Sequence, residues 1–177
     1  DNEDTFVFVV DCALDGLIDG GDGGFDTLVF DGGDFDTVTF AAASPSAGTV
    51  TRDGNTITYA GLEPIIDNAS VVDRVIGLSD VDDPDATLSE ASAGSMTLAG
   101  STFESITFAN PTGSLTVRGL LGTDSITIQS VSSGFDADLT VEAESITVDS
   151  GASIITNHDV TLKAVMNNSV TGTASPA

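Results

Sequence analysis

The chain has 177 residues and a formal net charge of −24, from 28 acidic and 4 basic residues, while 40% of its residues are hydrophobic. This length suits one domain with a proper core, and the high apolar content argues against a disordered chain. The charge argues against nucleic-acid binding, which needs a basic surface, and against binding to an anionic membrane. The longest apolar run, Phe6 to Val10, is far too short for insertion into a membrane.

Composition divides the chain into three parts, which we expect to form one continuous domain. Residues 1–47 are acidic and rich in Gly and Asp, residues 48–94 read as a hairpin and an irregular connector, and residues 95–177 are rich in Ser and Thr. The lone Cys12 allows no internal disulfide. Many aspartates with almost no lysine indicate an extracellular or cell-surface setting, and we expect the chain to be a segment of a longer protein.

The first part repeats the phrase Asp-Thr-apolar-any-Phe, with copies that begin at Asp4, Asp26 and Asp36. Two of these copies follow acidic, glycine-rich turns, residues 20–24 and 31–34, where glycine permits positive φ. Such turns expose carbonyl oxygens beside short carboxylates, and Ca²⁺ prefers six to eight oxygen ligands. The pattern therefore indicates calcium binding. Its alternative is a set of ordinary solvated turns whose aspartates cap backbone amides.

A nine-residue calcium repeat has the form G-G-x-G-x-D-x-U-x, where U is apolar. Residues 21–29 match it except for Asp22, and residues 31–39 match it less well. This stretch resembles the repeats-in-toxin calcium-binding β-roll family, found in large bacterial surface and secreted proteins. The resemblance covers residues 1–40 and implies Ca²⁺ sites between stacked turns. The ligands it implies are Asp4, Asp22, Asp26, Asp34 and Asp36.

The spacing of the repeated aspartates departs from a regular nonapeptide ladder. Asp4, Asp26 and Asp36 are 22 and 10 residues apart, rather than nine or eighteen. We therefore expect one or two calcium sites rather than a continuous row of them.

The connector contains one clear element. Residues 50–59 predict a hairpin with Asp53 and Gly54 in its turn. Residues 65–78 fit either a strand or a short helix, and residues 80–85 predict an acidic loop.

The third part repeats the phrase Ser/Asp-apolar-Thr-apolar, and its alternation at period two predicts short strands. Copies begin at Ser95, Ser105, Ser114, Ser125, Asp138, Ser145 and Asp159. Every second copy lies 19 to 24 residues further on, which predicts a right-handed parallel β-solenoid with β-roll-like N-terminal coils. The alternative is an antiparallel β-sandwich. The expected core is Met96, Leu98, Ile106, Phe108, Leu115, Val117, Ile126, Ile128, Leu139, Val141, Ile146, Val148, Val160 and Leu162.

Stacking of every second copy would also form an outward ladder of hydroxyl groups: Ser105, Thr107, Ser125, Thr127, Ser145 and Thr147. Such a face suits a glycan or ice as a ligand, and its alternative is the ordinary polar exterior of a soluble sheet. Catalysis has little support, because the chain lacks a G-x-S-x-G nucleophile motif and its basic residues are scattered.

The sequence therefore predicts a non-enzymatic, extracellular structural or adhesive β-solenoid segment that Ca²⁺ stabilises. Its ends would expose unpaired strand edges, and nothing at the C-terminal repeats resembles a polar cap. We expect other copies of the chain, or neighbouring domains of a longer chain, to cover those ends, end to end in a filament or surface layer. The alternative is a ligand-binding module that uses the hydroxyl ladder.

Overall fold

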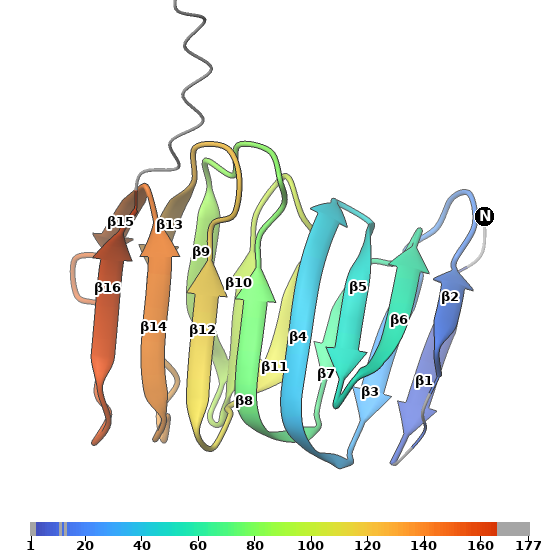
Figure 1. The fold of residues 1–177 in the computed structure, drawn as a ribbon, viewed down its shortest axis with the longest axis horizontal. Coiled ribbons are helices and arrows are strands. Elements are labelled where there is room, and N and C mark those ends of the chain that lie inside the picture. Colours follow the sequence, from blue (N-terminus) through green and yellow to red (C-terminus); the bar gives the residue numbers. More distant parts are fainter. Residues whose placement is uncertain (1–2, 11, 13, 166–177) are drawn as a thin grey trace, which may run out of the picture.

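The computed structural model describes residues 3–10, 12 and 14–165. Within these residues, sixteen strands form two eight-stranded sheets that pack face to face as a β-sandwich (Figure 1). The predicted all-β class is confirmed.

The strands of each sheet hydrogen-bond to their neighbours in the following order. Sheet A consists of β1 (Thr5–Val9), β3 (Thr27–Asp31), β7 (Ile65–Asp67), β11 (Ile106–Ala109), β10 (Ser95–Ala99), β9 (Ala86–Ser92), β13 (Ser125–Ile128) and β15 (Ser145–Val148). Sheet B consists of β16 (Val160–Ala164), β14 (Asp138–Ala143), β12 (Ser114–Arg118), β8 (Ser70–Gly77), β4 (Asp34–Ser44), β5 (Ala47–Arg52), β6 (Asn55–Ala60) and β2 (Gly16–Asp19).

The predicted parallel β-solenoid with β-roll-like N-terminal coils is wrong, because both sheets mix parallel and antiparallel pairs. The units β4–β5–β6 and β9–β10–β11 are antiparallel, and in sheet A β9 and β10 lie between β11 and β13, which the repeat predicted to be neighbours. As a result β11 pairs with β7 and β10, while β13 pairs with β9 and β15. The acidic phrases do not form one stack either, since two lie in β1 and β3 and the third lies in β4 of the other sheet.

Strand direction is nevertheless uniform apart from one strand in each sheet. Tracing the pairs shows that every strand of sheet A except β10 runs the same way. The same holds for sheet B except β5. One end of the sandwich, the N-terminal end, is formed by β1 and β2, and the other, the C-terminal end, by β15 and β16 (Figure 1). Corresponding strands of the two ends therefore run in the same direction.

Alternate residues of the strands fill the space between the sheets. The expected core residues from Met96 to Val141 are fully buried. The last four occupy the same inward positions, because Ile146 and Val148 of β15 lie beside Ile126 and Ile128, and Val160 and Leu162 of β16 lie beside Leu139 and Val141. Ile146 is half-buried and the other three are 42–43% exposed. These four lack cover because β15 and β16 are the last strands of their sheets.

Some inward positions carry charged residues, and among them is the fully buried ion pair of Arg74 with Asp67. Arg74 of β8 lies between Val38 and Leu115 in register, and its Nη1 donates to Asp67 Oδ2 of β7 at 2.6 Å, with both side chains fully buried. The guanidinium also lies 5.7 Å from the ring centre of Phe40 and 5.2 Å from that of Phe108. The segment 65–78, for which strand and helix were both open, is thus two strands, one in each sheet.

Candidate functional site

The predicted calcium ligands fall into two groups, the first around Asp26. This residue precedes β3, is only 2% exposed, and its Oδ1 accepts the backbone N–H of Asp4 at 2.7 Å. Its carbonyl oxygen accepts the backbone N–H of Glu63 at 2.6 Å. Asp22 is exposed in the preceding glycine-rich turn. Asp26 therefore ties the chain before β1 to the segment before β7.

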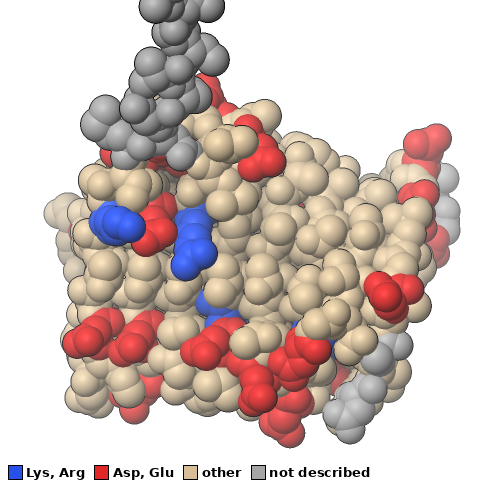
Figure 2. Space-filling model, viewed as in Figure 1, with Lys and Arg blue, Asp and Glu red and all other residues tan. Residues whose placement is uncertain are grey.

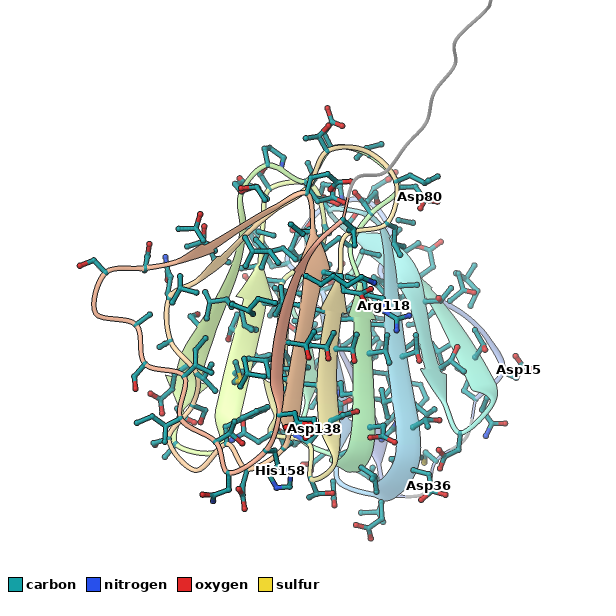
Figure 3. The ribbon with its side chains drawn as sticks, turned by 60° about the vertical axis from the view of Figure 1, so that its left-hand side comes forward. Asp15, Asp36, Asp80, Arg118, Asp138 and His158 are labelled. Atoms are coloured by element: carbon teal, nitrogen blue, oxygen red, sulfur yellow. The ribbon has the colours of Figure 1, made fainter. Side chains whose placement is uncertain are left out.

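The second group, Asp34 and Asp36, lies on β4 in the other sheet. The backbone N–H groups of Asp36 and Thr37 donate to the Asp53 carboxylate at 3.2 and 2.7 Å. Figure 3 shows Asp36 at the lower end of the strands and Asp80 at their upper end. In the described part of the chain, no group of three or more His, Cys, Asp or Glu residues is placed to hold a metal ion. The five aspartates do not converge on one site, and calcium binding stays a prediction.

A small polar cavity of about 160 Å³ adjoins Asp26. Glycines surround this cavity because the backbone at Gly20 and the backbone at Gly61 approach each other closely. A Cβ on Gly20 would lie 2.2 Å from the carbonyl oxygen of Gly61. Asp26, Ser46 and Glu63, whose side chains carry oxygen atoms, also line the cavity. These are oxygen donors of the kind that Ca²⁺ prefers, although they include only two carboxylates. Sequence reasoning missed Glu63, because it lies outside the repeats and far from Asp26 along the chain.

A second cavity, of about 380 Å³, shares Glu63 with the first. Its apolar walls include Phe25, Phe103 and Pro64, and Glu104 lines it with only 4% of its surface exposed. Burial, together with the nearby carboxylate of Glu63, raises the pKa of Glu104 to about 8, against an opposing hydrogen bond from the Ser105 backbone. Glu104 therefore carries a proton over much of the neutral range. No sequence motif marks this residue.

A third acidic feature is the buried pair of Asp83 and Asp124. Asp83 accepts hydrogen bonds from the hydroxyl groups of Ser79 and Thr102, and its own N–H donates to Asp124 Oδ1 at 3.2 Å. Asp124 Oδ2 is buried and has no hydrogen-bond partner among the described residues. Burial raises the pKa of Asp124 to about 6, and the Glu144 carboxylate adds to the effect. Buried carboxyl groups thus occur at two separate places in the sandwich.

The predicted hydroxyl ladder is split between two parts of sheet A. Ser125 and Thr127 of β13 face Ser145 and Thr147 of β15 in register. Ser105 precedes β11, and Thr107 of β11 faces Thr97 of β10, with the two hydroxyl oxygens 2.9 Å apart. Strands β10 and β9 separate the two parts, and both also carry outward threonines, Thr97 and Thr87. Binding of a glycan or ice at this face stays a prediction.

Both ends of the sandwich expose apolar side chains at edge strands. At the C-terminal end these are Val148, Val160 and Leu162, together with Ile155 in the preceding loop. At the N-terminal end they are Val7, Val9, Val10 and Leu17. Each edge strand also has one row of backbone groups without a neighbouring strand in its sheet. The two ends therefore combine apolar surface with available backbone hydrogen-bonding groups.

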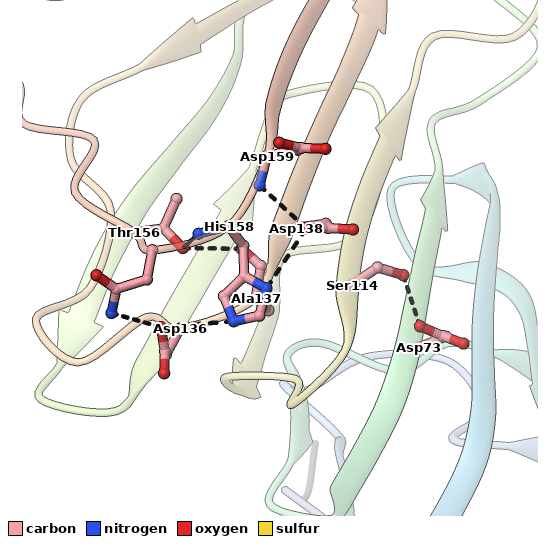
Figure 4. A network of polar contacts seen from close by, with 9 residues as sticks. Asp73, Ser114, Asp136, Ala137, Asp138, Thr156, His158 and Asp159 are labelled. Atoms are coloured by element: carbon pink, nitrogen blue, oxygen red, sulfur yellow. Dashed lines mark hydrogen bonds and ion pairs between the residues drawn. The ribbon is translucent and has the colours of Figure 1, made fainter.

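The two ends differ in charge. At the N-terminal end, Glu3, Asp4, Asp15 and Asp19 lie on or beside β1 and β2, and none of the four basic residues lies on these two strands. The exposed basic side chains Arg118 and Lys163 lie on β12 and β16, where both contact Glu142, and Figure 2 shows the largest blue patches on the β16 side. His158, just before β16, lies 3.6 Å from the carboxylates of Asp136 and Asp138 (Figure 4). The cationic groups of the surface are thus concentrated towards the C-terminal end.

Comparisons with family models, curated proteins and solved structures find no match to this chain. The described residues contain no helix with the length and apolar character needed to cross a membrane.

Proposed function

We propose that the chain is a non-enzymatic structural or adhesive segment of an extracellular or cell-surface protein, and that it assembles through the ends of its sandwich. The observation that carries this proposal is that core positions on the last strands of the C-terminal end are exposed. Val148, Val160 and Leu162 hold inward positions beside fully buried residues, yet about two-fifths of each is exposed. Exposed apolar surface of this kind marks interaction sites, and an unpaired strand edge is a ready template for another strand.

The charge of the chain limits which contacts can hold two copies together. With 28 acidic and 4 basic residues, electrostatic repulsion opposes non-specific association. Association of the ends should therefore depend mainly on short-range apolar contacts, and it should strengthen when salt screens the overall repulsion. The partners we propose are other copies of the chain or neighbouring domains of a longer chain.

Leu162→Lys tests the assembly. At about 0.5 M NaCl, where repulsion is screened, we expect the native chain to associate with rising concentration in sedimentation experiments. The variant should weaken association by about tenfold or more, because it replaces an apolar side chain at the end surface with a charge. Thr161→Lys is the matched control, since it adds the same charge to the same strand on the outward side. A native chain that stays monomeric throughout, or equal effects of the two variants, would contradict the proposal.

Calcium stabilisation is part of the same proposal, supported by the acidic turns and by the oxygen donors around Asp26. Saturating Ca²⁺, compared with a chelator, should raise the Tm by about 5–10 °C, since a ligand at 100 times its Kd contributes about 2.7 kcal/mol. Mg²⁺ should have a much smaller effect, because it keeps its water and demands stricter geometry.

Two variants locate the calcium effect. Glu63→Gln should remove the Tm shift if the ion is held beside Asp26, whereas Asp36→Asn, in the separate group on β4, should preserve it. If the native chain melts at the same temperature with Ca²⁺ and with chelator, the aspartates act only in turns and the calcium proposal is rejected.

A further inference from the structure

We infer that the partner of the C-terminal end is a second copy of this chain, docked head to tail, so that β15 pairs with β1 of the next copy and β16 pairs with its β2. This inference rests on the proposed function, and it names the partner and its orientation.

Strand direction is the first observation that favours this arrangement. Strands β1 and β15 run the same way in sheet A, and strands β2 and β16 run the same way in sheet B. Translating one copy along the row of strands in Figure 1 therefore brings both edge pairs together as parallel strands at once. Parallel pairing is also the mode by which each of these four strands joins its own sheet. Both sheets would continue across the junction without a change of direction.

The inward side chains match as well. Ile146 and Val148 of β15 would meet the inward Phe6 and Phe8 of β1, which lie beside the buried Leu28 and Phe30 of β3 and are themselves half-buried. In sheet B, Val160 and Leu162 would meet Ile18, the inward residue of β2. The junction would thus cover the core positions that a single copy leaves exposed.

Strand direction and charge separate this arrangement from a symmetric one. A twofold axis perpendicular to the sheets would pair β16 with the β16 of a second copy as antiparallel strands, whereas β15 and β16 both join their own sheets as parallel strands. Head-to-tail docking instead places the end that carries Lys163 against the end where Glu3, Asp4, Asp15 and Asp19 lie on or beside β1 and β2. The charge difference between the ends therefore favours the head-to-tail orientation. Because such a junction leaves one free end of each kind, it does not close and it generates filaments.

Cysteine cross-linking in a Cys12→Ser background tests the orientation. Thr147 of β15 and Val7 of β1 both point outward from sheet A, and outward side chains on neighbouring strands lie about 4.8 Å apart. One protein carries Thr147→Cys and the other Val7→Cys. On mild oxidation at about 0.5 M NaCl, the mixture should give a disulfide-linked heterodimer. Neither protein alone should dimerise, and a chain with both substitutions should give a ladder of oligomers.

Three controls accompany this test. A short bismaleimide linker can join the two cysteines even if a small shift in register places them too far apart for a disulfide. The pair Thr161→Cys with Leu17→Cys repeats the test in sheet B. Adding Leu162→Lys to the Thr147→Cys protein should abolish cross-linking, which excludes random collision.

The outcomes also separate the inference from the proposed function. Homodimers of the Thr147→Cys protein, or association without any cross-link between the two ends, would overturn the head-to-tail inference and leave assembly standing. Absence of both association and cross-links would overturn both.

Discussion

Replacing Arg74 with methionine is expected to destabilise the fold by about 3–5 kcal/mol, because it removes the hydrogen-bonded ion-pair partner of a buried carboxylate. Arg74 and Asp67 are both fully buried, 2.6 Å apart, and join β8 to β7 across the sandwich. Asp67 would keep only the backbone N–H of Ala69 as a hydrogen-bond donor. The loss of stability is measured as the shift in the midpoint of urea unfolding, provided that the dependence of the unfolding free energy on urea concentration is unchanged.

Two further variants show whether burial is the cause. Lys163→Met breaks the exposed pair with Glu142, at 3.1 Å, and should cost less than about 1 kcal/mol because water already solvates both groups. Asp67→Asn combined with Arg74→Met removes both charges and keeps an acceptor for Ala69. This double variant should recover much of the loss. A single Arg74→Met variant as stable as the native chain would show that the pair contributes nothing.

The second large effect is a rise in stability as the pH falls. Burial raises the pKa of Glu104 from 4.5 to about 8, so the folded chain holds this proton more tightly than the unfolded chain does. Stability from this group is fully present below pH 4.5 and is lost as the pH rises through about 8. Through this one group, the free energy of unfolding changes by at most about 1.4 kcal/mol per pH unit. Asp124, with its pKa raised from 3.8 to about 6, adds an effect of the same sign at lower pH.

Melting curves at about pH 5 and about pH 8.5 measure this effect, and we expect the Tm to be higher by roughly 5 °C or more at the lower pH. Glu104→Gln should flatten the profile, because the amide is neutral throughout. Glu3→Gln makes the same chemical substitution on an exposed residue and should leave the profile as it is. If both variants behave alike, general charge repulsion rather than Glu104 causes the pH dependence.

Local structure was largely predictable from residue patterns. The hairpin at residues 50–59 is confirmed as β5 and β6, and its turn residues Asp53 and Gly54 have positive φ. The Ser/Asp-apolar-Thr-apolar phrase is confirmed as strands, and its apolar positions point inward. Both predictions depend on neighbours within a few residues along the chain, where alternation and turn chemistry act directly.

The order of strands was not predictable in the same way. Period-two alternation of apolar residues predicts which side of a strand is buried, but it does not predict which strand lies next to it. The copies at Ser125 and Ser145 pair as predicted, whereas the copy at Ser105 pairs elsewhere because β10 and β9 lie between β11 and β13. The predicted solenoid failed for this reason.

The sequence by itself determined the acidic surface, the strand content and the inward-facing residues, since each follows from composition or local periodicity. Only the tertiary structure decided the burial of Asp67 with Arg74, the proximity of Glu63 to Glu104, and the exposure of Val160 and Leu162 at the C-terminal end. These features depend on which strands and loops meet across the sandwich. Such contacts arise from packing between segments that are distant along the chain, where the residue pattern carries no signal.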